Sequence, residues 1–429
     1  MLHRRQLLRG SLGALLAGSL VGTGRALAGP GTAAITPARR CIVLFLHGGA
    51  SQIDTFDPKP GSGNGGEFRA IESAVSGLRL SQHLPQLAKR MNHLALIRSL
   101  TAKEGNHERA RTLLHTGYAP QGGVEHPGLG AHHVRSLASK RSVAPSDLPR
   151  QVSLNIPGQS AGYLGARWSA FTVPDAASEV RNLAPPTDLP RDRTARRVEL
   201  WRALDEGFAK DHPAPQVQGA RAIGEQAVAM SAAPEIAAFD LAQESAQTRA
   251  RYGLDRELAA GKDGAAFVSG CLMARRLLES GVDFVEVGLR GWDTHEDNFN
   301  RVRKLSEALD RGASALIDDL IANGLWSETL LVCVGDFGRT PRINGRGGRD
   351  HFPQISSVLL GGGPIQGGTV VGATDADGEE IVDRPVSVPD LFATLTASLG
   401  IDGGEVHVTP AGRPVTTVDE TGSVVSELF

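Results

Sequence analysis

The stretch 330–353 of the sequence combines residue types that bind metal ions. It begins with an apolar run, 330–334, that predicts a buried strand, and Asp336 follows the end of that run. A loop rich in glycine and arginine comes next and carries Asp350 and His351. Carboxylates and imidazoles are the ligands of borderline and hard divalent cations, and a strand end holds such ligands firmly. This spacing therefore predicts a metal site.

Two other apolar runs are followed by similar polar clusters. Asp293 and His295 come after the run 284–289, and Asp54 comes after the run 42–46. Because parallel strands bring their carboxyl ends to one edge of a sheet, we expect the clusters to converge there. The prediction is a site for one or two divalent ions, of zinc, calcium or manganese, with ligands Asp54, Asp293, His295, Asp336 and His351.

Each of these residues also has a simpler structural interpretation. Asp54 suits a turn, because aspartate side chains often hydrogen-bond to the backbone two residues further on. Asp293 and His295 suit the entry of a helix, where Asp and Thr are common capping residues. His47, at the end of the first apolar run, suits a buried histidine with its hydrogen bonds satisfied.

The remaining pattern predicts an α/β fold. Strands and helices alternate along the second half of the chain, which is typical of βαβ units and a mostly parallel sheet covered on both faces. We predict a helical insertion around 175–262. The predicted strands are 42–46, 94–97, 152–156, 284–289, 329–334 and 357–360, and the predicted helices are 107–116, 129–137, 195–210, 216–231, 265–280, 299–323 and 389–399.

The first 28 residues have the three parts of an export signal. Arg4 and Arg5 form a twin-arginine pair, the stretch 10–24 is uncharged, and Ala26-Leu27-Ala28 is a small-residue cleavage site. The alternative is an uncut membrane anchor, but this core is short for a span of about 20 apolar residues. We expect export through the twin-arginine machinery, a periplasmic or secreted protein, and no stable membrane span after cleavage.

Charge and cysteine usage exclude two classes of function. Removal of the signal leaves 41 of the 45 basic residues against 47 acidic ones, a formal charge of −6. Nucleic-acid binding would call for a basic surface, so we expect no nucleic-acid partner. The three cysteines lie far apart without a CxxC pair, which argues against a thiolate zinc or iron–sulfur site.

Four motifs resemble those of a known family. The segments LFLHGGASQIDTFDPKP, GWDTHEDNF, GDFGRTP and GRDHFP, in this order behind a twin-arginine leader, are similar to the DUF1501 family of exported bacterial proteins. That family resembles the alkaline phosphatase and sulfatase superfamily. The resemblance implies one domain over 29–429, a three-layer α/β/α sandwich around a mostly parallel sheet, and metal ions at the strand ends.

The sequence departs from that superfamily where its nucleophile would stand. The segment 106–117 resembles the sulfatase helix, but it begins with Asn106 and His107 in place of a Ser, Thr or Cys. Hydrolysis would then need a water activated at the metal, or His107 as nucleophile or base. Arg109 lies two residues beyond His107 on the same predicted helix and is a second catalytic candidate.

These observations predict an exported metal-dependent hydrolase of a phosphate or sulfate ester. Arg339, Arg349 and Arg109 would grip an anionic substrate, either a small molecule or a polymer, because guanidinium groups match its oxygens. The alternative is a catalytically degenerate secreted binding or scaffold protein on the same fold, as the missing nucleophile indicates. A cofactor oxidoreductase is a third possibility, but Gly361-Gly362-Gly363 lacks the dinucleotide spacing.

Overall fold

Continuous apolar runs form the central strands of this protein. The computed structural model describes residues 35–120, 122–140, 147–185 and 190–429, and the predicted export signal 1–28 lies outside this part of the chain. Within the described ranges, no helix is both long enough and apolar enough to cross a membrane.

The main sheet contains nine of the described strands. Their order across the sheet is β12-β4-β11-β8-β1-β7-β5-β6, and β15 also pairs with β4. The bounds are β1 Arg40–Leu46, β4 Leu94–Thr101, β5 Gln151–Leu154, β6 Phe171–Val173, β7 Phe284–Leu289, β8 Thr329–Gly335, β11 Ser356–Gly361, β12 Val370–Val371 and β15 Val386–Ser387.

The strands β1, β7 and β8 end level with one another. All three run parallel, with β1 in the middle. Leu46, the last residue of β1, lies opposite Leu289 of β7 on one side and Gly335 of β8 on the other. The loops that follow these strands therefore start from one edge of the sheet, as the sequence predicts.

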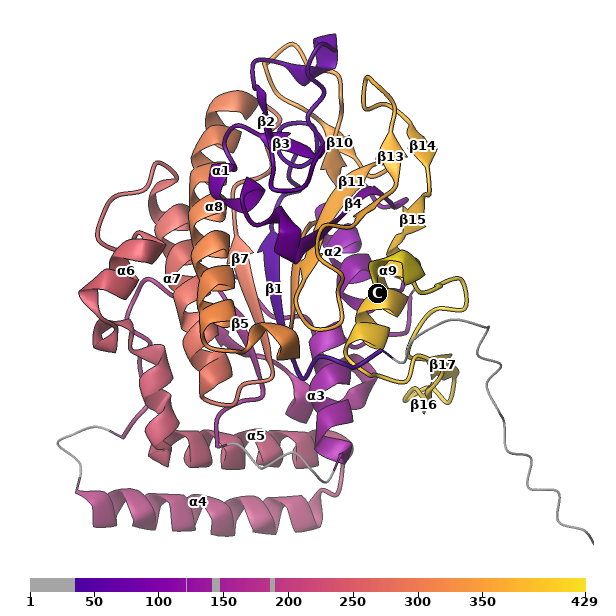
Figure 1. The fold of residues 1–429 in the computed structure, drawn as a ribbon. Helices are drawn as coiled ribbons and strands as arrows, with labels where there is room; N and C mark the ends of the chain where they lie inside the picture. The colour runs from indigo at the N-terminus through magenta and orange to yellow at the C-terminus, as the bar shows by residue number, and fades with distance from the viewer. Residues whose placement is uncertain (1–34, 121, 141–146, 186–189) are drawn as a thin grey trace, which may run out of the picture. The chain divides into compact units, whose positions relative to one another are not determined.

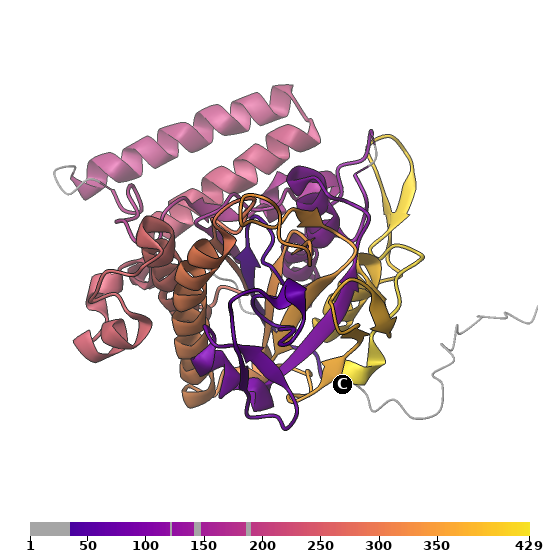
Figure 2. The same ribbon diagram turned by 90° about the horizontal axis from the view of Figure 1, so that it is seen from above.

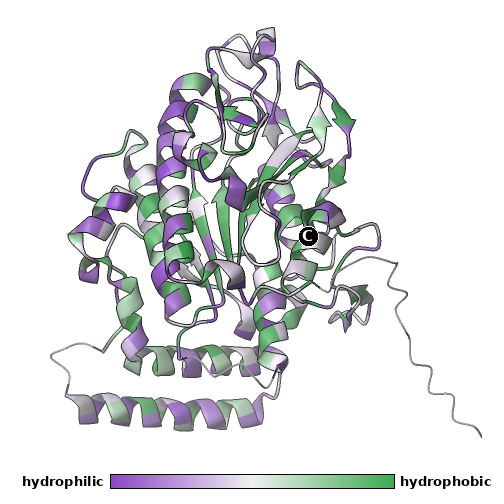
Figure 3. Ribbon diagram, in the orientation of Figure 1, coloured by the Kyte–Doolittle hydropathy of each residue, from purple (hydrophilic) through white to green (hydrophobic). Residues whose placement is uncertain are grey.

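Helices cover both faces of the sheet, which confirms the predicted three-layer α/β architecture (Figures 1 and 2). Along β1, Ile42, Leu44 and Leu46 pack in the core that contains α7 (Gly261–Glu279) and α8 (Asn298–Ala322). Val43 and Phe45 pack in the core that contains α2 (His107–Thr116), α3 (Leu129–Ser139) and α9 (Val388–Ser398). This alternation follows from the two-residue period of a strand. Figure 3 shows the central strands as the most hydrophobic part of the fold.

The helices match most of the predicted ones within a few residues. The stretch 175–262 contributes α4, α5 and α6, which lie outside the three layers in Figure 1. The bounds are α1 Pro85–Ala88, α2 His107–Thr116, α3 Leu129–Ser139, α4 Arg191–Asp211, α5 Pro215–Ala232, α6 Ala246–Tyr252, α7 Gly261–Glu279, α8 Asn298–Ala322 and α9 Val388–Ser398.

Short antiparallel pairs account for the other described strands. The pair β9–β10 folds the loop after β8 back on itself, next to the strand ends. The bounds are β2 Ala70–Glu72 with β3 Arg79–Ser81, β9 Gly338–Arg339 with β10 His351–Phe352, β13 Ala373–Thr374 with β14 Ile381–Asp383, and β16 Val406–Val408 with β17 Pro414–Thr416.

Two details of the sheet differ from the predicted βαβ pattern. β11 runs antiparallel to both β8 and β4, because the loop between β8 and β11 contains no helix that would carry the chain back for parallel pairing. The predicted strand 152–156 ends at Leu154, because Asn155 takes up a left-handed backbone conformation with φ of 69°.

A buried ion pair fixes the loop between β8 and β11. Arg349 donates from Nε and Nη2 to the two carboxylate oxygens of Asp54, at 2.7 and 3.0 Å, and both side chains are fully buried. Asn298, at the start of α8, donates to the same carboxylate. The pair therefore connects the loop after β1, the loop after β8 and the start of α8.

We predict that Arg349→Met will destabilise the protein by about 3–5 kcal/mol, because it leaves the Asp54 carboxylate buried without its cation. Urea or guanidinium unfolding measures the change. Arg346→Ala serves as the control, because Arg346 is exposed and lies 3.9 Å from Glu296, so its loss should have little effect. Equal stability of the two variants would contradict the structural role of the buried pair.

Candidate metal centre

Backbone contacts hold the loop after β7 against the loop after β8. The Arg349 amide donates to the Thr294 carbonyl at 3.0 Å, and Asn344 Nδ2 donates to the His295 carbonyl at 3.0 Å. Gly348 lies so close that a Cβ there would stand 2.0 Å from the His295 carbonyl oxygen. Only glycine fits at this position, and the contact brings the GWDTHEDNF and GRDHFP motifs together.

The short pair β9–β10 places His351 near the end of β8. His351 lies opposite Arg339 in this antiparallel pair, and Arg339 is only three residues beyond Asp336. Nδ1 of His351 donates to the Gly105 carbonyl at 2.7 Å, because a carbonyl can only accept. The ring is thereby fixed with Nε2 toward Asp293, whose Oδ1 lies 3.2 Å away.

His107 and Asp336 form a second fixed pair. His107 is the first residue of α2, and its Nδ1 donates to Oδ2 of the buried Asp336 at 2.7 Å. The Gly48 amide donates to the same oxygen at 2.9 Å. The His107 ring also stacks on Phe337, with centroids 4.8 Å apart. A second ring contact, with His351 at 4.5 Å between centroids, and the hydrogen bond to Asp336 complete the contacts that set its position.

His295 is oriented in the same way as His107. Its Nδ1 donates to Asp350 Oδ1 at 2.7 Å, and its Nε2 lies 3.2 Å from Asp293 Oδ1. Asn344 Nδ2 also donates to Asp350 Oδ1, at 3.2 Å. A carboxylate on the outer nitrogen of a histidine is the arrangement that orients metal-binding imidazoles in proteins.

Three imidazoles thus converge on one carboxylate oxygen. The Nε2 atoms of His295, His351 and His107 lie 3.2, 3.2 and 3.5 Å from Asp293 Oδ1. The Nε2 atoms of His295 and His351 are only 3.0 Å apart, so at most one of them carries a proton. At least one nitrogen lone pair therefore faces into the cluster.

The charges in this cluster shift the pKa values of its members. Burial alone would raise the pKa of Asp293, but the hydrogen bond and the charge of Arg339 hold it well below its usual range. The hydrogen bond to Asp336 raises the pKa of His107. Burial lowers the pKa of His351, and the hydrogen bond to the Gly105 carbonyl offsets this only in part. The lowered pKa favours the neutral imidazole, which is the form that binds a metal ion.

The donor atoms fit a divalent ion. His107, Asp293 and His351 each offer one ligand atom, and these atoms lie within 4.8 Å of one another. His107 Nε2 and Asp336 Oδ1 are buried, and neither has a hydrogen-bond partner in the described part of the chain. Buried polar atoms are usually paired, so these two unpaired atoms are the surroundings expected of a cation site.

Arg339 is buried beneath the cluster and binds its loops, so it is not available to bind a substrate. Its side chain is fully buried, and its guanidinium donates to the Gly48 and Gly49 carbonyls, to Asp293 Oδ1 at 2.5 Å and to the Arg349 carbonyl. These contacts join the loops after β1, β7 and β8. The predicted substrate-binding role for Arg339 is therefore corrected to a positioning role.

Three other predicted site residues lie away from the cluster. All five N–H groups of Arg349 donate within the protein, to Asp54 and to the carbonyls of Asn64, Thr340 and Pro341, so this arginine is not free to bind a substrate. Asp54 is its buried partner and does not reach the imidazoles. The exposed Arg109 forms a two-point ion pair with Glu104, at 2.6 and 2.7 Å, and does not contact the cluster.

The sequence interpretation missed three contributions to the cluster. His107 joins it beside Asp293 and His351, whereas we expected a catalytic side chain apart from the ligands. The sequence did contain an indication that His107 belongs to the cluster, because His107 follows β4. This strand runs parallel to β8 and ends at the same edge of the sheet. The supporting role of Asp350 follows from its place beside His351. The Gly105 carbonyl left no signal in the sequence.

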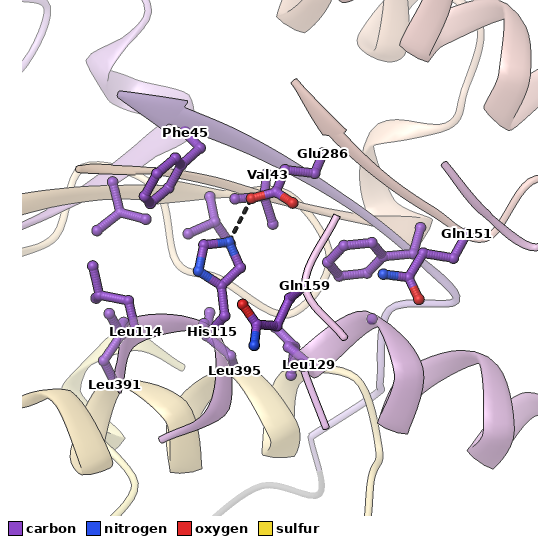
Figure 4. Close-up of a pocket in the computed structure, with 15 residues that line it drawn as sticks. Val43, Phe45, Leu114, His115, Leu129, Gln151, Gln159, Glu286, Leu391 and Leu395 are labelled. Carbon is purple, nitrogen blue, oxygen red and sulfur yellow. Dashed lines mark hydrogen bonds and ion pairs between the residues drawn. The ribbon is translucent and has the colours of Figure 1, made fainter. Parts of the chain in front are cut away.

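A separate cavity lies between the sheet and α2, α3 and α9 (Figure 4). Its lining is mainly apolar, but His115 Nε2 lies 2.5 Å from Oε1 of Glu286, a residue in the middle of β7. Its volume is about 30 Å³, which is room for about two water molecules. This cavity is too small for an ester substrate.

Several solved structures are similar in fold. The lipoteichoic acid synthase LtaP from Listeria monocytogenes is 9% identical with a TM-score of 0.40, covering 87% of this chain and 74% of that one. A protein of the alkaline phosphatase superfamily from Vibrio parahaemolyticus is 13% identical with a TM-score of 0.37, covering 85% and 69%. The C-terminal periplasmic domain of EcEptC from Escherichia coli, in complex with Zn, is 11% identical with a TM-score of 0.39, covering 89% of each chain. At such TM-scores these likenesses carry no inference about chemistry.

The family comparison covers nearly the whole described chain. No curated protein sequence matches. The family model described as a protein of unknown function, DUF1501, matches residues 38–429, and this range contains all four motifs and every residue of the cluster. The chain belongs to the DUF1501 family.

Proposed function

We propose that this protein is an exported, metal-dependent hydrolase of phosphate or sulfate esters. The observation that supports the proposal is the convergence of His107, His295 and His351 on Asp293, with Nδ1 of each imidazole held by an acceptor. Such fixed imidazoles with a carboxylate are typical of catalytic metal centres. A divalent ion held there would lower the pKa of bound water and stabilise negative charge that develops on the ester oxygens.

The residues of the chain would divide the work in this site. Asp293, His107, His351 and His295 would hold the ion. One oxygen of Asp336 bonds to His107, and its second, buried oxygen has no hydrogen-bond partner among the described residues. Asp336 would therefore either orient His107 or add a further ligand. Asp350 and the Gly105 carbonyl would keep the other two rings in place.

The ligand types favour zinc, with manganese as the second choice. Calcium binds six to eight oxygen ligands, and an imidazole-rich cluster does not match that preference. The substrate anion would need a cation other than the buried Arg339 and Arg349. Arg290 is exposed directly after β7, three residues before Asp293, and we propose that it contacts the substrate.

A binding or scaffold protein without catalysis is the second candidate. The observation that favours it is the position of hydroxyl and thiol groups. All three cysteines are buried, and Thr340, in the loop after β8, has its Oγ1 bonded to the Arg342 carbonyl and the Asp350 amide. The contacts of the described residues therefore place no Ser, Thr or Cys in the cluster as a nucleophile.

The first prediction for this site concerns metal content. Purified protein reconstituted with zinc should retain at least one ion after dialysis, measured by mass spectrometry of the metal. Asp293→Ala and His351→Ala should lose it, because each removes a ligand atom. His93→Ala is the matched control, since His93 lies at the amino end of β4 and should leave the metal content unchanged. Full retention in both ligand variants would contradict the proposed centre.

The affinity for zinc should depend on pH through His107. Its hydrogen bond to Asp336 raises the pKa of His107, so a proton competes with the ion up to a higher pH than at an ordinary histidine. Affinity should rise with pH and level off above that raised pKa. In Asp336→Asn the plateau should be reached at lower pH and should be about 10–100-fold weaker. Competition with a coloured chelator measures the zinc affinity of both proteins as a function of pH. Identical pH profiles of the two proteins would disprove the effect of Asp336 on His107.

Turnover separates the two candidate functions. The zinc and manganese forms should hydrolyse at least one class among aryl phosphates, phosphodiesters and aryl sulfates. Chelation and Asp293→Ala should abolish this activity, whereas Arg290→Ala should mainly raise KM. A protein that holds its ion through Asp293 and His351 yet turns over none of these substrates would be the binding or scaffold protein.

A further inference from the structure

The helices α4 and α5 form a hairpin that the candidate metal centre does not use. Trp201 of α4 packs over Gly224 of α5, where an added Cβ would stand 2.4 Å from the ring. Arg202 of α4 pairs with Glu225 of α5 at 2.7 Å. Figure 1 shows the hairpin beyond the amino-terminal ends of the strands, at the end of the sheet opposite the metal-binding loops.

One side of α4 leaves large apolar side chains in solvent. Leu200, Leu204 and Phe208 are 61, 67 and 55% exposed. Their spacing of four residues makes them a single ridge on the helix surface, the kind of ridge that packs into a groove of another helix. We call these three residues the α4 ridge. An exposed apolar row of this kind on a helix marks an interaction surface.

Charged residues extend the α4 ridge at both ends, with opposite signs. Arg197 lies on the same side of the helix toward its start, and Asp211 lies on the same side at its end. Both are exposed, and neither has an ion-pair partner among the residues that the structure describes. The side of α4 that carries the ridge is therefore positive, then apolar, then negative.

This order of charges matches a second copy of the same helix running in the opposite direction. If two α4 helices meet with Leu204 at the two-fold axis, Leu200 faces Phe208 of the other copy and Arg197 faces Asp211, since each pair is equally spaced about residue 204. A parallel pairing would instead place Arg197 against Arg197 and Asp211 against Asp211. The charges thus select the antiparallel pairing.

We propose that this chain forms a two-fold dimer in which α4 of one copy packs antiparallel on α4 of a second copy, through the α4 ridge. The two hairpins would then form a four-helix arrangement. A contact made by one helix pair is smaller than the usual stable interface, so the affinity should be on the order of micromolar. The metal-binding loops of both copies stay open, because the hairpin lies at the other end of the sheet.

Charge exchange tests the pairing directly. Sedimentation or light scattering of the whole protein over rising concentration should show a monomer–dimer equilibrium. Arg197→Asp alone or Asp211→Arg alone should weaken the dimer at least about tenfold, because each creates two like-charge contacts across the axis. The double variant Arg197→Asp with Asp211→Arg should restore it. Circular dichroism of each single variant checks that it is folded. Glu206→Lys, on the other side of α4, is the matched control and should leave the dimer unchanged.

A cysteine at the axis provides an independent measurement. All three native cysteines are buried, so Leu204→Cys introduces a single reactive exposed thiol. Mild oxidation should cross-link Leu204→Cys into a covalent dimer, whereas Glu206→Cys should remain monomeric. A monomer at every concentration would overturn the proposal. A dimer that ignores the charge exchange, or a monomer that uses the ridge to bind anionic lipid vesicles, would overturn it as well.

Discussion

The buried guanidinium of Arg339 is the group on which the candidate site depends. A charge without exposure to water must be paired and hydrogen-bonded inside the protein, and the acceptors of Arg339 come from the loops after β1, β7 and β8. Three loops that are far apart in sequence are thereby held at one point. The position of the imidazole cluster depends on these contacts, because Asp293 is both the ion-pair partner of Arg339 and the carboxylate on which the imidazoles converge.

The sequence predicts the parts of the fold that follow from hydrophobic pattern alone. The runs 42–46, 284–289 and 329–334 are continuous and apolar, so they could only be buried strands, and their parallel arrangement brings the polar residues behind them to one edge. That argument reached Asp293, His295, Asp336 and His351. The same rule, applied to β4, would have added His107 to this set of candidate ligands.

Pattern alone does not distinguish a buried arginine from an arginine that binds a substrate. Arg339 and Arg349 both stand in glycine-rich loops, which is where anion-binding arginines are also found, and the difference lies in tertiary partners such as Asp54. The antiparallel direction of β11 is a second feature that the sequence analysis did not predict. The lack of a helix between β8 and β11 was visible in the sequence, but the strand alternation elsewhere outweighed it.

The electrostatics of the cluster explain why the imidazoles keep their orientation without a cation. His107 lies between the carboxylates of Asp336 and Asp293, and His295 lies between those of Asp293 and Asp350. One buried guanidinium, that of Arg339, pairs with Asp293. The hydrogen bond to Asp336 raises the pKa of His107, so a proton on this ring can supply part of the missing positive charge. The Nδ1 contacts fix the rings whether or not that proton is present. A cation that replaces the proton would therefore find the imidazoles already oriented and would require little rearrangement of the loops.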